Sequence, residues 1–338
     1  MSTRMAADMH EQPAVLRALA DRRPELVEAL RRAICPPLGT VIVARGSSDY
    51  AAVFGRYVLE MATRRPVALA APSLTTLYDA RTELSGWLAI GVSQSGQTPE
   101  IATVLERYRE AGASTVAVTN HAPSALSDTA HATVELGAGD EQAVPATKTF
   151  TAQLAAFAVI AEALGPVPWD DAAWDQLPDA VAGLLADPDP ADRAAAALGD
   201  AAGLVCIARG YLNAVALEAA LKLREAAGMR AEGWSAADFR HGPIAAAGSG
   251  LPVLAISAPG PAAVDVDDLT TRLRDQGTRV LRLAAEAGPD LPIPTEPGEP
   301  LAAITAVVRA QQLALAVAEH RGLDPDSPAG LSKVTPTR

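Results

Sequence analysis

A strand-turn-helix pattern occurs twice in this chain, and it limits the possible folds more than any other feature of the sequence. Short apolar runs at residues 40–44 and 203–208 are each followed by Arg-Gly and then by an amphipathic helical stretch. Apolar, β-branched runs bounded by turn residues are typical of buried parallel strands. The two halves of the chain are therefore predicted to be copies of one duplicated unit.

Further strands are predicted in both halves, with helical stretches between them. The predicted strands lie at residues 87–92, 115–118 and 133–136 in the first half and at 252–257 and 279–283 in the second. The predicted helices lie at 13–34, 101–111, 214–227 and 301–321. This alternation predicts an α/β fold with a doubly wound parallel sheet in each half. Ligands of such sheets bind beyond the carboxyl ends of the strands.

The length of 338 residues is about twice that of a common single domain, which favours two domains in tandem. Prolines are frequent between residues 165 and 190, which predicts a connector with a short helix. The expected divisions are an N-terminal helical segment at 1–35, a first domain at 36–165, the connector at 166–190, a second domain at 191–321 and a C-terminal tail at 322–338.

Charge and composition disfavour several classes of partner. The net charge of −12 repels a phosphate backbone, so neither nucleic acid nor an anionic membrane is expected as a partner. The two cysteines, Cys35 and Cys206, lack the spacing of metal ligands or of a disulfide framework. The first 32 residues lack the apolar core of a signal peptide, and no run of 18 apolar residues occurs. We expect a soluble cytoplasmic protein.

The segment Ser-Gln-Ser-Gly-Gln-Thr-Pro-Glu, residues 93–100, follows a predicted strand and leads into a predicted helix. Thr98 fits the N-cap position and Pro99 the first helical position. Backbone N–H groups and the hydroxyls of Ser93, Ser95 and Thr98 then converge on the positive end of a helix, which is suited to phosphate. Because the segment has no Gly-Lys-Ser/Thr, no GxGxxG and no basic residue, a phosphomonoester fits it better than a nucleotide. The alternative is a serine-rich turn that only caps a helix.

The first strand is followed in the equivalent way by Arg-Gly-Ser-Ser-Asp, residues 45–49. Ser47 and Ser48 are therefore candidates to add hydroxyls to the same crevice. By itself this turn is equally compatible with a structural role.

Three charged residues share one face of the predicted helix at 214–227. Glu218, Lys222 and Glu225 are spaced i, i+4 and i+7, and the residues around them are mostly apolar. A carboxylate that is partly desolvated beside an ammonium has an adjustable pKa, as a general base requires. The alternative is a surface ladder of ion pairs, each contributing about 0.3–0.5 kcal/mol.

Lysine is rare in this chain, which has only Lys148, Lys222 and Lys333 among 28 basic residues. A guanidinium cannot replace a compact, rotatable ammonium whose pKa can shift. The three lysines are therefore candidates for chemistry, although chance in a lysine-poor composition is the alternative.

One histidine differs from the others in its setting. His241 follows Ser235-Ala-Ala-Asp238, which resembles a capping box, and the Gly-Pro after it forces a turn that would present the imidazole. A turn histidine that is merely exposed is the alternative.

Together these segments resemble the sugar isomerase (SIS) family, and most closely the isomerase half of glutamine:fructose-6-phosphate aminotransferase and the stand-alone SIS-type glucosamine-6-phosphate deaminases. The resemblance spans about residues 40 to 335. It rests on four motifs, namely Ser93-Gln94-Ser95-Gly96-x-Thr98, Ala216-Leu217-Glu218-x-Ala220-Leu221-Lys222-x-x-Glu225, His241-Gly242-Pro243 and Leu331-x-Lys333-Val334-Thr335. It implies two flavodoxin-like SIS domains in tandem.

The resemblance also implies roles for residues. The phosphosugar would be bound by Ser47, Ser48, Ser93, Gln94, Ser95, Thr98 and Glu218. Glu225 would shuttle a proton between C2 and C1, His241 would open the sugar ring, and Lys222 and Lys333 would be cations near the developing enediolate. The histidine reaches the site from the neighbouring subunit in that family, so a homodimer is implied, and the tail would lie over the active site. No metal or other cofactor is implied, and Lys148 would be structural.

Two residues depart from the family pattern. Pro145 replaces a small residue in the segment that ends at Lys148, and Arg230 replaces a histidine before Ala-Glu. Either change could reshape the pocket around C1 and C2. Ser2 follows Met1, and only a short segment precedes the first strand, so no glutaminase domain and no helix-turn-helix domain is expected.

The expected reaction is conversion of glucosamine 6-phosphate to fructose 6-phosphate and ammonia. One alternative is a dehydratase that acts on N-acetylglucosamine 6-phosphate or another phosphosugar. A sensor that binds a phosphosugar without catalysis is the other alternative.

Overall fold

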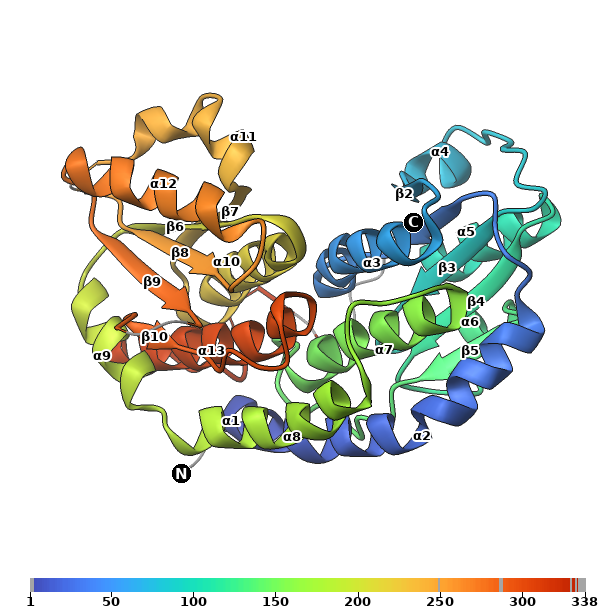
Figure 1. Cartoon of the computed structure of the whole chain (residues 1–338), viewed down its shortest axis with the longest axis horizontal. Coiled ribbons are helices and arrows are strands. Elements are labelled where there is room, and N and C mark those ends of the chain that lie inside the picture. Colours follow the sequence, from blue (N-terminus) through green and yellow to red (C-terminus); the bar gives the residue numbers. More distant parts are fainter. Residues whose placement is uncertain (1–2, 249, 286–287, 329, 332, 334–338) are drawn as a thin grey trace. The chain divides into compact units, whose positions relative to one another are not determined.

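The computed structural model describes residues 3–248, 250–285, 288–328, 330, 331 and 333. Val334 and Thr335 of the predicted tail motif lie outside these residues. The chain divides into two compact units, each built around one sheet (Figure 1). The first-sheet unit contains residues 14–140 and 148–168 together with Lys333, and the second-sheet unit contains residues 1–13, 141–147 and 169–331.

The first sheet has five parallel strands in the order β2-β1-β3-β4-β5. Their bounds are β1 Thr40–Val43, β2 Val67–Leu69, β3 Leu88–Val92, β4 Ser114–Thr119 and β5 Ala132–Glu135. The accompanying helices are α2 Gln12–Ala33, α3 Ser47–Thr63, α4 Pro72–Thr76, α5 Pro99–Glu110, α6 Ala125–Asp128 and α7 Lys148–Leu164. Val43 of β1 lies opposite Gly91 of β3, so the turns that follow these two strands leave the sheet side by side.

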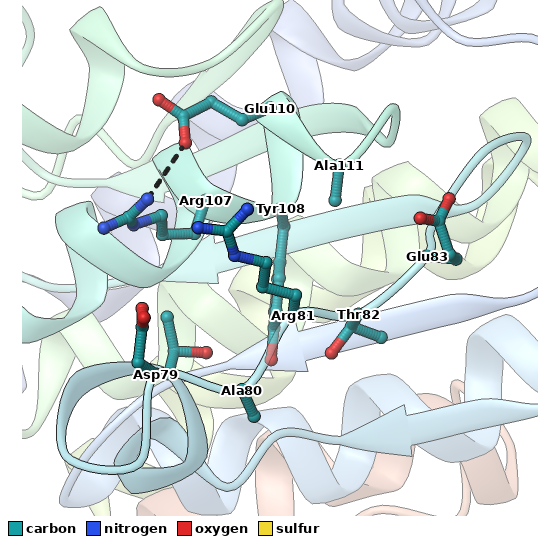
Figure 2. A pocket seen from close by; sticks show the side chains of 10 residues that line it. Asp79, Ala80, Arg81, Thr82, Glu83, Arg107, Tyr108, Glu110 and Ala111 are labelled. Carbon is teal, nitrogen blue, oxygen red and sulfur yellow. Dashed lines mark ion pairs between the residues drawn. The ribbon is translucent and has the colours of Figure 1, made fainter.

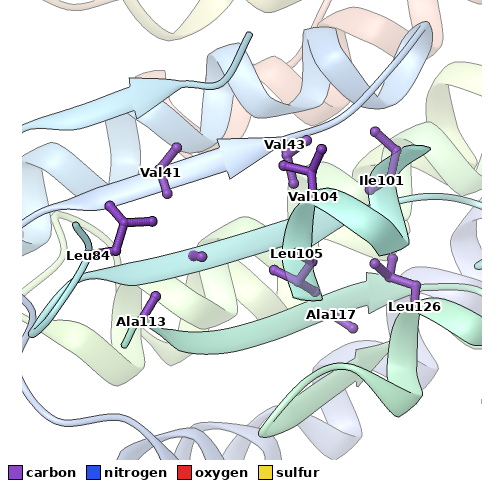
Figure 3. Packing of buried hydrophobic residues seen from close by; sticks show 10 residues of the cluster. Val41, Val43, Leu84, Ile101, Val104, Leu105, Ala113, Ala117 and Leu126 are labelled. Atoms are coloured by element: carbon purple, nitrogen blue, oxygen red, sulfur yellow. The ribbon is translucent and has the colours of Figure 1, made fainter. Parts of the chain in front are cut away.

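One face of the first sheet packs against α5 and α6 (Figure 3). Val41 and Val43 of β1 meet Ile101, Val104 and Leu105 of α5 in a buried cluster. Burial of each such side chain contributes about 1.5–3 kcal/mol. This packing fixes the direction of α5, and with it the position of the turn before the helix.

Helices α3 and α7 pack against each other in the same unit. Gly55 of α3 permits a close approach, because a Cβ at this position would lie 2.5 Å from the ring of Phe157 in α7. Nearly all of α7 is buried, which explains why it is apolar on every side.

The second sheet also has five parallel strands, in the order β10-β9-β8-β6-β7. Their bounds are β6 Gly203–Ala208, β7 Arg230–Ser235, β8 Val253–Ser257, β9 Val280–Ala284 and β10 Leu291–Pro292. Taken from the other edge, this order repeats that of the first sheet, with β6 in the place of β1 and β8 in the place of β3. The predicted duplication is confirmed, as is the predicted α/β class with two parallel sheets.

The helices of the second-sheet unit include α10, which carries Glu218, Lys222 and Glu225. They are α1 Arg4–His10, α8 Asp171–Ala186, α9 Asp189–Leu198, α10 Asn213–Ala227, α11 Ala236–Arg240, α12 Ala263–Asp275 and α13 Glu299–His320, with the 3₁₀ helices η1 Gly210–Leu212 and η2 Pro243–Ala246. By length and composition α13 could cross a membrane, but 94% of its apolar window is buried inside the protein, as in a core helix.

The proline-rich stretch before the second sheet differs from the expectation. It contains α8, a helix of 16 residues that continues through Pro178. A proline inside a helix is costly. Here Trp174, Leu177, Val181 and Leu184 bury one apolar face, which stabilises the helix despite the proline.

Candidate active site

The serine-rich turn after β3 has the local geometry of an anion site. Thr98 is the N-cap of α5 and Pro99 its first residue, as predicted. The backbone N–H groups of Glu100 and Ile101 belong to the first turn, where they have no intrahelical acceptor. Gly96 has φ +64°, and a Cβ there would lie 2.3 Å from the Ser124 hydroxyl, so only glycine fits this position.

The hydroxyls of the turn are arranged differently from a simple cap. The hydroxyls of Ser93 and Thr98 hydrogen-bond to each other at 2.9 Å, and Thr98 makes no side-chain cap bond. The Ser95 hydroxyl accepts from the N–H of Gln97 at 3.2 Å. Gln94 anchors the turn to β4 through its backbone carbonyl, which accepts from the N–H of Asn120 at 3.1 Å. This arrangement places paired hydroxyls beside a helix N-terminus.

The turn after β1 lies beside this one in the sheet. Ser47 begins α3, and Ser48 is buried, with its hydroxyl accepting from Gln153 Nε2 at 2.9 Å. Ser47 is only partly buried. In the second sheet, Ser257 at the end of β8 takes the register position of Ser93, and the segment after it, Ala-Pro-Gly-Pro-Ala at residues 258–262, carries no hydroxyl. Of the two duplicated units, the first therefore has the larger number of hydroxyls at this end of its sheet.

The structure adds a cation that the sequence analysis did not assign to this turn. Arg45 Nε donates to Glu100 Oε2 at 2.9 Å, and Nη2 donates to Oε1 at 3.0 Å. Glu100 lies in the first turn of α5, two residues after Thr98. The two partners are 55 residues apart in the chain, so no local pattern indicates the pairing.

In the second-sheet unit, helix α10 carries the predicted charge cluster. Lys222 Nζ lies 3.3 Å from Glu218 Oε1 and also donates to Glu225 Oε2. The side chains of Glu218 and Lys222 are 0% and 1% exposed, whereas that of Glu225 is 20% exposed. The alternative of a solvated ion-pair ladder is therefore wrong. Of the two α10 carboxylates, Glu225 is the one that a small molecule can reach.

Burial and charge act in opposite directions on Lys222. Burial alone would lower the pKa of its ammonium. The charges of Glu218, Glu225 and Glu141 outweigh this effect, and the pKa is raised above its ordinary value. Lys222 is therefore a fixed cation at neutral pH.

Glu141 was not singled out in the sequence, yet it belongs to the same unit as α10. Its buried carboxylate accepts from the backbone N–H of Thr147 at 2.7 Å. The bond closes the segment that contains Pro145, which is also buried. A third carboxylate thus acts on Lys222 from outside α10.

Comparison with known proteins assigns both sheets to one family. The SIS domain model matches residues 40–163 and 198–318, which cover both sheets. This chain belongs to the SIS-domain family.

Curated relatives of this SIS chain match it over part of their own length. It is 31% identical to glutamine–fructose-6-phosphate aminotransferase (isomerizing) of Methanothermobacter thermautotrophicus, over 97% of this chain and 56% of that protein. The same enzyme of Gloeobacter violaceus is 32% identical, over 97% of this chain and 58% of its own. The chain therefore spans little more than half the length of these relatives.

Solved structures match along the whole SIS chain. A candidate phosphosugar isomerase from Silicibacter pomeroyi has a TM-score of 0.87 and 31% identity, covering 96% of this chain and 100% of its own. Glucosamine-6-phosphate deaminase from Thermotoga maritima has a TM-score of 0.81 and 22% identity, covering 99% and 100%. The second likeness shows a shared fold.

The remaining predicted residues of the SIS site occupy several elements. His241 ends α11 and is exposed in the expected turn. The capping box before it is wrong: Ser235 is the N-cap of α11, but its hydroxyl accepts from Arg209 at 3.0 Å instead of capping the helix. Lys333 is partly buried. Arg230 is exposed at the start of β7.

Lys148 is buried at the start of α7 in the first SIS domain. Its ammonium donates to the backbone carbonyl of Asp140 at 2.9 Å. Asp140 is the last residue of the first-sheet unit before the chain passes into the other unit, and Lys148 is the first residue after its return. The bond therefore joins the points where the chain leaves and re-enters the unit, which favours a structural role.

A cavity of about 640 Å³ lies beside Glu225 in the second-sheet unit. Its walls are largely apolar and come from α10 and from the segment after α13, including Leu221, Leu323 and Leu331. A second cavity, of about 280 Å³, lies in the first-sheet unit between residues 79–83 and the end of α5 (Figure 2). It contains an Arg107–Glu110 ion pair at 3.5 Å and none of the predicted site residues.

Metal ligation has no candidate among the residues that the structure describes, since they hold no group of three or more His, Cys, Asp or Glu side chains suited to an ion.

Proposed function

We propose that the chain is an amino-sugar phosphate isomerase that releases ammonia. It would convert glucosamine 6-phosphate and water to fructose 6-phosphate and ammonia. The observation that carries the proposal is the reachable carboxylate of Glu225 beside the buried cation Lys222. Such a pair suits a base that must take a proton and return it to a neighbouring atom.

The reaction follows from these groups. His241 opens the ring, and the Glu225 carboxylate takes the C2 proton of the open-chain aldehyde. The C1 oxygen becomes negative as electrons move from C2, and the preorganised charge of Lys222 stabilises it, with Lys333 as the second proposed cation. Glu225 returns the proton to C1, a proton passes from the nitrogen on C2 to the C1 oxygen, and water then hydrolyses the resulting C2 imine to the ketone and ammonia.

Besides the base and the cations, the reaction requires binding of the substrate phosphate, and we assign this role to the serine-rich turn. The hydroxyls of Ser93, Ser95 and Thr98, the first-turn N–H groups of α5 and the adjoining Ser47, Ser48 and Gln94 are the proposed ligands. Fully buried Glu218 is proposed to act through Lys222. The relatives named above as isomerizing aminotransferases support a hexose 6-phosphate as substrate.

A dehydratase is the second candidate, favoured by the apolar cavity beside Glu225. Such a space could hold the acyl group of N-acetylglucosamine 6-phosphate. The same base would then take the C2 proton, and the C3 hydroxyl would leave as water.

The state of assembly and the cellular location also belong to the proposal. A homodimer in the cytoplasm is proposed, because exposed His241 resembles the family's histidine that serves the neighbouring subunit. Light scattering after size-exclusion chromatography should give twice the mass of 34.8 kDa, and a monomer would contradict the dimer.

Incubation with two substrates separates the candidate reactions. Ammonia and fructose 6-phosphate from glucosamine 6-phosphate would support the deaminase, and a product lighter by one water from the N-acetylated sugar would support the dehydratase. Binding of both without turnover would favour a sensor and contradict the proposal.

A substitution of Glu225 tests its proposed role as the base. In Glu225→Gln, exchange of the C2 proton with deuterated solvent should fall by about 10³-fold or more, because the amide cannot accept the proton, while calorimetric binding of fructose 6-phosphate remains. The control is Glu319→Gln, at an exposed position near the end of α13. Retained exchange in Glu225→Gln would remove this residue from the base role.

A further inference from the structure

Arg45 presents a fixed positive charge at the turn after β1. Its side chain is 44% exposed, whereas that of its partner Glu100 is 3% exposed. A bidentate bond to a buried carboxylate restricts the long side chain to one direction. The bonds use Nε and Nη2, and Nη1 meets no acceptor among the described residues. Arg45 therefore keeps N–H donors for a ligand.

The sheet register places this guanidinium next to the serine-rich turn. Val43 of β1 pairs with Gly91 of β3, so Arg45 and Ser93 each lie two residues beyond paired positions. Glu100 also belongs to the first turn of the helix that the serine-rich turn precedes. The arginine and the candidate phosphate hydroxyls are thus held by the same helix start.

Charge explains what the arginine would add. A phosphomonoester carries close to two negative charges at neutral pH, and the serine-rich turn offers only neutral donors. The carboxylate of Glu100 interacts with the positive end of α5 as well as with the guanidinium, and the charge of Asp49 also acts on Arg45. A planar guanidinium also suits the geometry of phosphate oxygens.

We propose that Arg45 is a phosphate-binding residue of this site and that Glu100 is the positioning residue that aims it. The inference rests on the proposed function and deepens it. It assigns the phosphate site a cation that neighbours the serine-rich turn in space and lies outside it in sequence.

The duplicated unit contains a corresponding arginine–carboxylate pair, in which the carboxylate is more exposed and also binds Arg240. Arg209 follows β6 as Arg45 follows β1, and its Nε lies 3.4 Å from Asp265 Oδ2 in the first turn of α12. The exposed fraction of the Arg209 side chain, 43%, is almost the same. The segment at residues 258–262 before α12 has no hydroxyl, and Ser257, at the register position of Ser93, is the one serine at the end of β8. Arg209 is therefore a control in which an arginine at the equivalent position loses its carboxylate partner without a serine-rich turn beside it.

The experiment measures binding, so it does not depend on turnover. Purified full-length protein is titrated with fructose 6-phosphate and with inorganic phosphate by calorimetry. Arg45→Ala should weaken both ligands about tenfold or more, and Arg45→Lys should weaken them less because it keeps the charge. Arg209→Ala should leave both affinities within twofold of wild type.

Folding is controlled by a second variant. Arg45→Ala leaves a buried carboxylate without its cation, so Arg45→Ala/Glu100→Gln removes both charges and should fold like wild type while still binding weakly. Glu100→Gln alone should weaken binding less than Arg45→Ala, because the cation remains but is less well aimed. Wild-type affinity in the double variant would overturn this inference alone. Failure of the wild-type protein to bind either ligand would overturn both the inference and the proposed function.

Discussion

The charge state of Lys222 limits what this residue can do. Its raised pKa keeps the amine protonated at neutral pH, and a protonated amine cannot attack a carbonyl to form an imine. The ion pair contributes stability below the ordinary lysine pKa of about 10.4 and loses it only as pH rises through the higher folded value. Lys222 therefore acts as a permanent cation throughout the neutral range.

Removal of this cation should destabilise the protein more than removal of the whole pair. Lys222→Met leaves the Glu218 carboxylate buried without its ammonium, and we expect a loss of about 3–5 kcal/mol in the free energy of unfolding. Lys222→Met/Glu218→Gln should recover most of that loss. Urea denaturation at pH 7 measures both variants. Equal stabilities for the single and double variants would contradict this account.

The two cysteines should differ sharply in reactivity. Burial raises the pKa of Cys206 to about 12, so it stays a thiol at pH 8, whereas Cys35 is exposed. A chromogenic disulfide reagent at pH 8 should titrate one thiol in the native protein and two in urea. Cys35→Ser should abolish the native reaction, and rapid release of two equivalents from the folded protein would contradict the burial of Cys206.

At the scale of elements, the contact between α3 and α7 depends on a missing side chain. Gly55→Ala would place a methyl group 2.5 Å from the Phe157 ring in a fully buried position, which should cost about 1–3 kcal/mol. Gly183, in the interior of α8, has open space around it, so Gly183→Ala should instead stabilise by about 0.5–1 kcal/mol. Thermal denaturation compares the two, and a shift of the same sign in both would contradict the packing argument.

Sequence patterns predicted the central strands and the edge strand β5, and missed the edge strands β2, β7 and β10. β1, β3 and β6 are continuous buried runs, and these are what apolar clustering detects. The edge strand β7 has exposed polar residues, and the edge strand β10 is two residues long and contains a proline, so neither carries an apolar run. Helix α7 has no polar face, which removes the helical period.

The same division between local and distant contacts applies to the site. The spacing of Glu218, Lys222 and Glu225 on one helix was readable because it lies within eight residues. The contributions of Arg45 to the serine-rich turn and of Glu141 to Lys222 join segments far apart in the chain. Such partners are brought together only by the sheet register and the fold, so the spacing of residues in the sequence does not indicate these contacts.

At the scale of the whole molecule, the chain leaves its first sheet unit briefly and contributes residues 141–147 to the second. Three elements hold this segment there. The Asp8 carboxylate of α1 accepts from the N–H groups of Gln142 and Ala143 at 2.8 Å each, and the Asp326 carbonyl accepts from Val144. Gln311 Nε2 of α13 donates to the Thr147 carbonyl at 3.2 Å. The segment that carries Glu141 is thus fixed within the unit of Lys222.

This arrangement predicts an effect on catalysis from the N-terminal helix. Asp8 is almost completely buried, so Asp8→Ala leaves two backbone N–H groups without their charged acceptor and should cost about 1–3 kcal/mol in stability. Displacement of Glu141 should also alter the charge balance at Lys222 and lower kcat several-fold. The serine-rich turn, the proposed phosphate site, belongs to the other unit, so the affinity for fructose 6-phosphate should change less than twofold. The control is Asp21→Ala, at an exposed position on α2. An unchanged kcat in folded Asp8→Ala, or an equal loss of phosphate affinity, would show that the segment does not serve the charge cluster.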